Sequence, residues 1–113
     1  MVCALALREG VPVRNAGGSM GEELRKAEVR TNDAFEEGFF DEGATVSNLV
    51  RIIDSLPAGS TELMCHPAHE DAELAASSSY AAVRVRELAA LCDPSVKAAI
   101  SRAGIRLITF TEL

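Results

Sequence analysis

A short apolar run that ends in a histidine and a proline does most to limit how this chain can fold. Residues 61–67 read TELMCHP. Extended backbone over residues 61–65 would turn Glu62, Met64 and His66 toward one face of a strand. The proline disfavours helical backbone at His66 and has no N–H with which to continue a pairing. His66 is therefore predicted at the carboxyl end of a strand, where α/β folds bind their ligands.

The rest of the chain alternates predicted helices with predicted strands. Helical spacing and capping residues predict helices over residues 1–9 (ended by Gly10), 46–56 (begun by Thr45), 80–91 (begun by Ser79) and 95–102 (begun by Asp93 and Pro94, ended by Gly104). Residues 21–26 are expected to add a turn or two of helix. Strands are predicted over residues 11–14, 61–65 and 105–110, whereas residues 28–43 show no clean period and stay unassigned.

This order predicts an α/β fold, as a partial (β/α) barrel segment with about three parallel strands joined by right-handed crossover helices. A length of 113 residues predicts one small domain with a limited core, so residues 1–113 are treated as a single segment. A chain that opens near the end of a helix is expected to have been cut from something longer.

Composition narrows the classes of function. The 11 Lys and Arg residues against 17 Asp and Glu give a net charge of −6, which argues against nucleic acid as a partner. Residues 1–7 are apolar, but the run is short and lacks the basic start of a signal peptide, so neither a signal peptide nor a transmembrane helix is predicted. A cytoplasmic location is expected. Cys3, Cys65 and Cys92 are odd in number and show no C-x-x-C spacing, which favours reduced core thiols.

Several motifs, in order, resemble the YdjC-like carbohydrate deacetylases, a family with ChbG- and HpnK-type members. The strongest are ELMCHP over residues 62–67 and the pattern Y-x-x-x-R-x-x-E-L-x-x-L over residues 80–91. Upstream, residues 11–15 resemble the family's strand that ends in an arginine, and residues 29–35 resemble its T-x-D-x-F segment. The resemblance covers nearly the whole chain and corresponds to the carboxyl-terminal half of the family.

The resemblance implies a distorted (β/α) barrel and hydrolysis of the N-acetyl group of an amino sugar, aided by a divalent metal such as zinc or magnesium. The metal ligands and the base lie in the amino-terminal half of the family, so they are expected outside this chain. His66 is implied as the catalytic position. Arg14 is implied as a substrate-binding residue, since its guanidinium can bind an anionic or acetyl oxygen. The implied substrate is an N-acetylated oligosaccharide or a glycolipid-type molecule.

The neighbours of His66 leave alternatives open. Glu62 shares the predicted face of His66, where it either orients the imidazole beside the substrate or is an ordinary polar residue of the barrel interior. Ala68 stands where the family has glycine, and alanine would strain the loop if that position needs a positive φ. Arg84 and Glu87 lie three residues apart on the predicted helix, so we expect an ion pair that holds the His66 loop in place.

The polar residues around His66 contain enough donors for a transition-metal site. They are Cys65, His66, His69, Glu70 and Asp71. Consecutive residues of a strand point to opposite faces and cannot all converge on one ion, which favours a loop of solvated polar groups.

Two hypotheses from different classes follow. In the first, the chain is the carboxyl-terminal part of a deacetylase, catalytically incomplete, with either a complementary amino-terminal half or a second copy of itself as partner. In the second, it is a non-catalytic module that binds a sugar or a protein through Arg14 and His66. A third and less favoured hypothesis is that the local Cys, His and acidic cluster replaces the metal site and restores hydrolysis.

Overall fold

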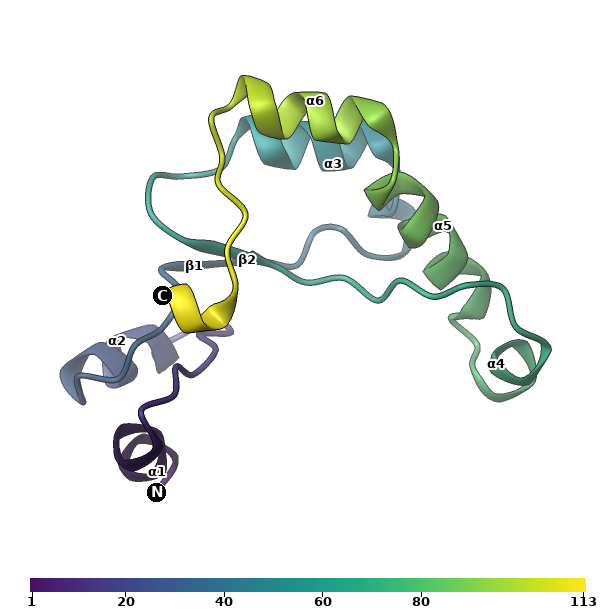
Figure 1. The fold of residues 1–113 in the computed structure, drawn as a ribbon. Helices are drawn as coiled ribbons and strands as arrows, with labels where there is room; N and C mark the ends of the chain where they lie inside the picture. The colour runs from purple at the N-terminus through teal and green to yellow at the C-terminus, as the bar shows by residue number, and fades with distance from the viewer. The chain divides into compact units, whose positions relative to one another are not determined.

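The computed structural model describes residues 1–113 as a mixed α/β chain with several helices and two short parallel strands (Figure 1). The helices are α1 (Val2–Glu9), α2 (Met20–Lys26), α3 (Val46–Asp54), α4 (Ala72–Ser77), α5 (Ala81–Leu91) and α6 (Pro94–Arg102). The strands are β1 (Ala34–Glu36) and β2 (Thr61–Leu63), and two short 3-10 turns are η1 (Asp41–Gly43) and η2 (Phe110–Glu112).

The chain forms two compact units. Unit 1 consists of Met1–Glu36, Pro57–Glu62 and Leu107–Leu113, and unit 2 consists of Glu37–Leu56 and Leu63–Arg106.

Local capping explains where several helices begin and end, as predicted. The Thr45 hydroxyl accepts a backbone N–H of the first turn of α3 at 3.2 Å. The Asp93 carboxylate accepts a first-turn N–H of α6 at 2.8 Å, and Pro94 is the first residue of that helix. Gly10 and Gly104 follow α1 and α6 with φ of 67°, a left-handed conformation that glycine adopts at little cost.

Unit 1 has a small core and polar ties between distant segments. Its buried residues Ala6, Leu24 and Val29 pack with Cys3, Val13 and Ala27. Arg30 donates hydrogen bonds to the carbonyl oxygens of Gly10 (2.7 Å), Thr111 (3.2 Å) and Leu113 (3.1 Å). One guanidinium therefore joins the end of α1 and the last residues of the chain to the segment that leads into β1.

The start of β2 is fixed to the residue that precedes β1. Ser60 donates its backbone N–H and its hydroxyl to the Asp33 carboxylate, at 2.8 and 3.1 Å. These two hydrogen bonds lower the pKa of Asp33 below its ordinary value. The Ala34 N–H in turn donates to the Ser60 carbonyl at 2.9 Å.

Unit 2 holds the larger core. Helix α3 packs against α6 and α5, and Figure 1 shows α3 and α6 side by side. The buried residues are Phe39, Ala44, Leu49, Ile52, Ile53, Ala90, Val96 and Ala99. The apolar stripe predicted for residues 46–56 is confirmed, because Leu49 and Ile53 are buried while Val46, Val50 and Leu56 pack against the same core.

The strand predictions are only partly confirmed. Strand β2 ends at Leu63, two residues before the predicted end. The predicted strands over residues 11–14 and 105–110 are wrong, since β1 and β2 form the whole sheet. A strand needs a neighbour to pair with. Residues 11–14 instead donate to two separate carbonyls: the Val11 N–H to Ala6 at 3.0 Å and the Val13 N–H to Arg30 at 2.9 Å.

Three further expectations need correction. Helix α4 was not predicted, although Asp71 caps it by accepting the Leu74 N–H at 2.9 Å. The predicted cap Ser79 is wrong, because α5 begins after Tyr80, whose side chain makes no capping bond. The three cysteines are free thiols, but Cys92 is exposed and so is not a core residue. None of the helices is long and apolar enough to span a bilayer.

Candidate active site

His66 is held by its backbone against α5. The His66 N–H donates to Glu87 Oε1 at 2.8 Å, and Arg84 Nη1 donates to the His66 carbonyl at 3.3 Å. The Ala68 N–H donates to the Arg84 carbonyl at 3.2 Å. Together these bonds fix both sides of the proline that follows the histidine. Ala68 does not have a positive φ, so the loop accepts alanine there without backbone strain.

The same helix face holds a second loop. Tyr80, Arg84 and Glu87 are spaced by four and three residues, so they lie on one side of α5. The Tyr80 hydroxyl accepts the Asp41 N–H at 2.7 Å. Arg86 donates to the Asp41 carbonyl at 2.7 Å, and the loop that contains η1 is thereby fixed next to the His66 segment.

Three rings meet where these two loops approach each other. The rings of Phe40 and Tyr80 are stacked, with centroids 4.9 Å apart and planes 12° from parallel. The His66 ring meets both of them edge-on, with centroids 6.0 Å apart in each case. An open cavity of about 350 Å³ lies beside them, lined by Glu37, Phe39, Phe40, Met64 and His66.

The polar groups behind this cavity are buried and only partly satisfied. Glu87 is 0% exposed, and its Oε2 has no hydrogen-bond partner. His66 Nδ1 and Arg84 Nε are also buried without a partner. The predicted ion pair between Arg84 and Glu87 is not formed. Each side chain instead binds the backbone of His66, so the expected support of the loop exists with different contacts.

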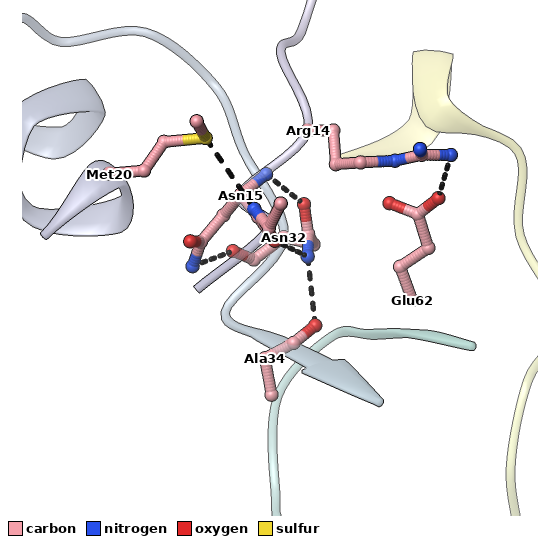
Figure 2. A network of polar contacts seen from close by, with 7 residues as sticks. Arg14, Asn15, Met20, Asn32, Ala34 and Glu62 are labelled. Atoms are coloured by element: carbon pink, nitrogen blue, oxygen red, sulfur yellow. Dashed lines mark hydrogen bonds and ion pairs between the residues drawn. The ribbon is translucent and has the colours of Figure 1, made fainter. Parts of the chain in front are cut away.

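Arg14 and Glu62 come together in unit 1, as Figure 2 shows. Arg14 Nη2 lies 2.5 Å from Glu62 Oε1, and the Arg14 guanidinium lies over the Phe35 ring at 5.7 Å from its centroid. The Glu62 side chain is 14% exposed and the Arg14 side chain 54%. Glu62 is thus the ion-pair partner of Arg14, while His66 belongs to unit 2. That Glu62 orients the His66 imidazole, and that Arg14 and Glu62 bind substrate, stay predictions.

Two asparagines fix the backbone at the residue that follows Arg14 (Figure 2). The Asn15 N–H donates to Asn32 Oδ1 at 2.8 Å, and Asn32 Nδ2 donates back to the Asn15 carbonyl at 3.0 Å. Asn32 Nδ2 also donates to the Ala34 carbonyl at 2.8 Å. Both side chains are buried. Sequence reasoning missed this pair. Asn15 directly follows the expected strand over residues 11–14, a position where asparagine often bonds to the backbone, whereas Asn32 lies in the unassigned region.

The comparison with known proteins decides the family. The family model of YdjC-like proteins matches residues 2–102. The chain belongs to the YdjC-like family. This is the family that the ELMCHP and Y-x-x-x-R-x-x-E-L motifs predict.

Individual relatives of this YdjC-like chain are longer than it is. A carbohydrate deacetylase of Geobacillus stearothermophilus is 38% identical over 109 residues, which cover 96% of this chain and 42% of the relative. A chitooligosaccharide deacetylase of Yersinia pestis (strain Pestoides F) is 31% identical, with coverage of 99% and 46%.

A crystal structure of a proposed cellobiose-phosphate cleavage protein from Enterococcus faecalis V583 is also similar. It is 31% identical and superposes with a TM-score of 0.84, covering 98% of this chain and 45% of the other. The chain therefore spans less than half the length of the relatives that it matches.

The side chains of this YdjC-like chain do not form a binding site for the metal that the family implies. No three His, Cys, Asp or Glu side chains are grouped so that they could hold an ion. Asp71, one member of the polar run after His66, caps α4. The placement of metal ligands outside residues 1–113 stays a prediction.

The sole tyrosine reports on this site by titration. Burial raises the pKa of the Tyr80 phenol above 10.0, and the Glu87 carboxylate raises it further, while the Asp41 N–H lowers it. Because the chain has one tyrosine, an absorbance titration follows Tyr80 alone. We expect a midpoint above 10.0, and a lower midpoint in Glu87→Gln. A midpoint that the substitution leaves unchanged would show that Glu87 does not act on the phenol.

Proposed function

We propose that this chain supplies the His66 part of the active site of a carbohydrate deacetylase that removes the acetyl group from N-acetylated amino sugars. The observation that carries the proposal is the His66 imidazole. It lines a cavity, its backbone is held on both sides by α5, and its buried Nδ1 has no hydrogen-bond partner within the protein. A fixed histidine with an unpartnered ring nitrogen beside a cavity fits a group that acts on a ligand.

The reaction is the hydrolysis of an amide. Water adds to the acetyl carbonyl while a base, expected outside residues 1–113, takes one of its protons; the C–N bond then breaks, and acetate and the free amine of the sugar leave. The amine nitrogen must gain a proton as the bond breaks, and the His66 imidazolium is the donor that we assign to this step. A divalent metal, which the family implies, is expected to be held by polypeptide outside residues 1–113.

Arg14 is assigned to substrate binding in the same enzyme. Its guanidinium is half exposed, and Glu62 and the Phe35 ring fix its position. The free N–H groups of a guanidinium suit an acetyl or anionic oxygen. The substrate class follows from relatives that are named carbohydrate and chitooligosaccharide deacetylases.

A chimeric enzyme tests the proposal. The 109 aligned residues of this chain would replace the matching 42% of the Geobacillus stearothermophilus deacetylase. We expect this chimera to release acetate from N-acetylated chitooligosaccharides, measured by a coupled acetate assay. A folded chimera without turnover, beside an active parent enzyme, would contradict the proposal.

A second candidate function is a non-catalytic module that binds a sugar or a protein. It is favoured by one observation: the cavity beside His66 is formed within unit 2 alone, so it does not depend on other polypeptide. Saturable binding of a sugar by this chain, together with an inactive chimera, would favour the module over the enzyme.

A further inference from the structure

Phe40 has an environment unlike that of its neighbour Phe39. Phe39 is 0% exposed in the core of unit 2, whereas Phe40 is 52% exposed. Single exposed apolar side chains are common on protein surfaces, so exposure alone has no meaning here. What distinguishes Phe40 is that its ring and its loop are both held in place at the edge of a cavity.

The ring of Phe40 is supported from one side only. Tyr80 stacks against that side at a centroid distance of 4.9 Å, and the Tyr80 hydroxyl accepts the N–H of the next residue, Asp41, at 2.7 Å. Arg86 binds the Asp41 carbonyl at 2.7 Å. These contacts oppose a collapse of the ring into the cavity. Since Phe40 is 52% exposed while Tyr80 stacks against one face, we infer that the other face is open.

The open ring lies beside His66. The two rings meet at 72° with centroids 6.0 Å apart, and both line the same cavity of about 350 Å³. Small-molecule pockets have volumes of about 300–1,000 Å³. Met64 supplies apolar lining beside Phe40, and Glu37 supplies a carboxylate.

This lining matches the surface of a sugar ring. A pyranose has an apolar face of C–H groups and a rim of hydroxyls, and the negative face of an aromatic ring attracts the weakly positive C–H hydrogens. A carboxylate and an imidazole accept or donate hydrogen bonds to hydroxyls. The negative charge of Glu37 disfavours a phosphorylated sugar, so the chemistry fits a neutral one.

We propose that the open face of Phe40, supported by Tyr80, is a stacking platform for the pyranose ring of a neutral N-acetylated amino sugar and holds that ring beside His66. The proposal rests on the proposed deacetylase function for the identity of the sugar. It makes Phe40 a substrate-binding residue, and Tyr80 the residue that positions it.

Tyrosine fluorescence tests the platform directly, because the chain contains one tyrosine and no tryptophan. Di-N-acetylchitobiose would be titrated into the full 113-residue chain and into Phe40→Ala and Phe40→Leu, with circular dichroism as the check on folding. Phe110→Ala is the matched control, since Phe110 is also exposed but belongs to unit 1. We expect a saturable change in the parent and the control, with binding at least about tenfold weaker in both Phe40 variants, a loss typical of one stacking contact.

Equal binding by parent and Phe40→Leu, or no binding by the folded parent, would overturn the platform. Either result leaves the deacetylase proposal to the chimera. The converse is also distinguishable: sugar binding that depends on Phe40, in a chain whose chimera releases no acetate, supports the platform and contradicts the enzyme.

Discussion

Replacement of Glu87 by alanine is expected to destabilise unit 2 by about 2–4 kcal/mol, because two losses add at one position. The side chain is fully buried, so its removal leaves a cavity next to the core. Its carboxylate also accepts the His66 N–H at 2.8 Å, and that N–H would be left without a partner. Urea unfolding followed by circular dichroism measures the change in the free energy of unfolding.

Two variants sharpen this prediction. Glu87→Gln keeps an oxygen that can accept the His66 N–H and removes a buried charge, so we expect a change of less than about 1 kcal/mol. Glu73→Ala on α4 is the exposed control, and a surface change of this kind stays within about 0.5 kcal/mol. If Glu87→Ala were as stable as Glu73→Ala, Glu87 would not support the His66 loop.

The second large effect is on turnover. In the chimera, His66→Ala is expected to lower kcat by about 10²–10⁴-fold, the range for removal of a general acid or base. KM is expected to change little, because in this account Phe40 and Arg14 bind the sugar. Initial rates of acetate release over a range of substrate concentrations separate the two constants.

His69→Ala is the matched control for that experiment. It is the other histidine of the chain, lies three residues further along the same loop, and is exposed. It should leave kcat within about twofold, as is usual for an exposed side chain outside a site. Equal losses in the two histidine variants would point to loop damage, and no loss in His66→Ala would remove the histidine from the reaction.

Much of the local structure that neighbouring residues decide was predictable, with α4 and the start of α5 as exceptions. Thr45, Asp93 and Gly10 supply their caps and C-terminal turns through contacts within one helical turn, and the corresponding helices were predicted. The strands expected over residues 11–14 and 105–110 depend on a distant partner strand. Near the second of these segments, the carbonyls of Thr111 and Leu113 accept hydrogen bonds from Arg30, a contact that no sequence period reveals.

In the site, too, the features that a sequence motif specifies were predicted, and those that depend on contacts between distant residues were not. The position of His66 beyond the end of β2 and the support of its loop by α5 followed from the motifs, and the family is confirmed. The stacking of Phe40 on Tyr80 joins residues forty positions apart, in a region with no recognisable period. Glu87 was expected in an ion pair with Arg84, but its carboxylate is fully buried and accepts the His66 N–H instead, a long-range contact that helical spacing does not reveal.

The most direct test of the account is acetate release from N-acetylated chitooligosaccharides by the folded 113-residue chain alone, with and without added zinc or magnesium. The account predicts no release under any of these conditions, because the side chains of residues 1–113 form no metal-binding group and the rest of the site is assigned to other polypeptide. Metal-dependent release that is lost in His66→Ala would contradict it, since this chain would then contain a complete site of its own.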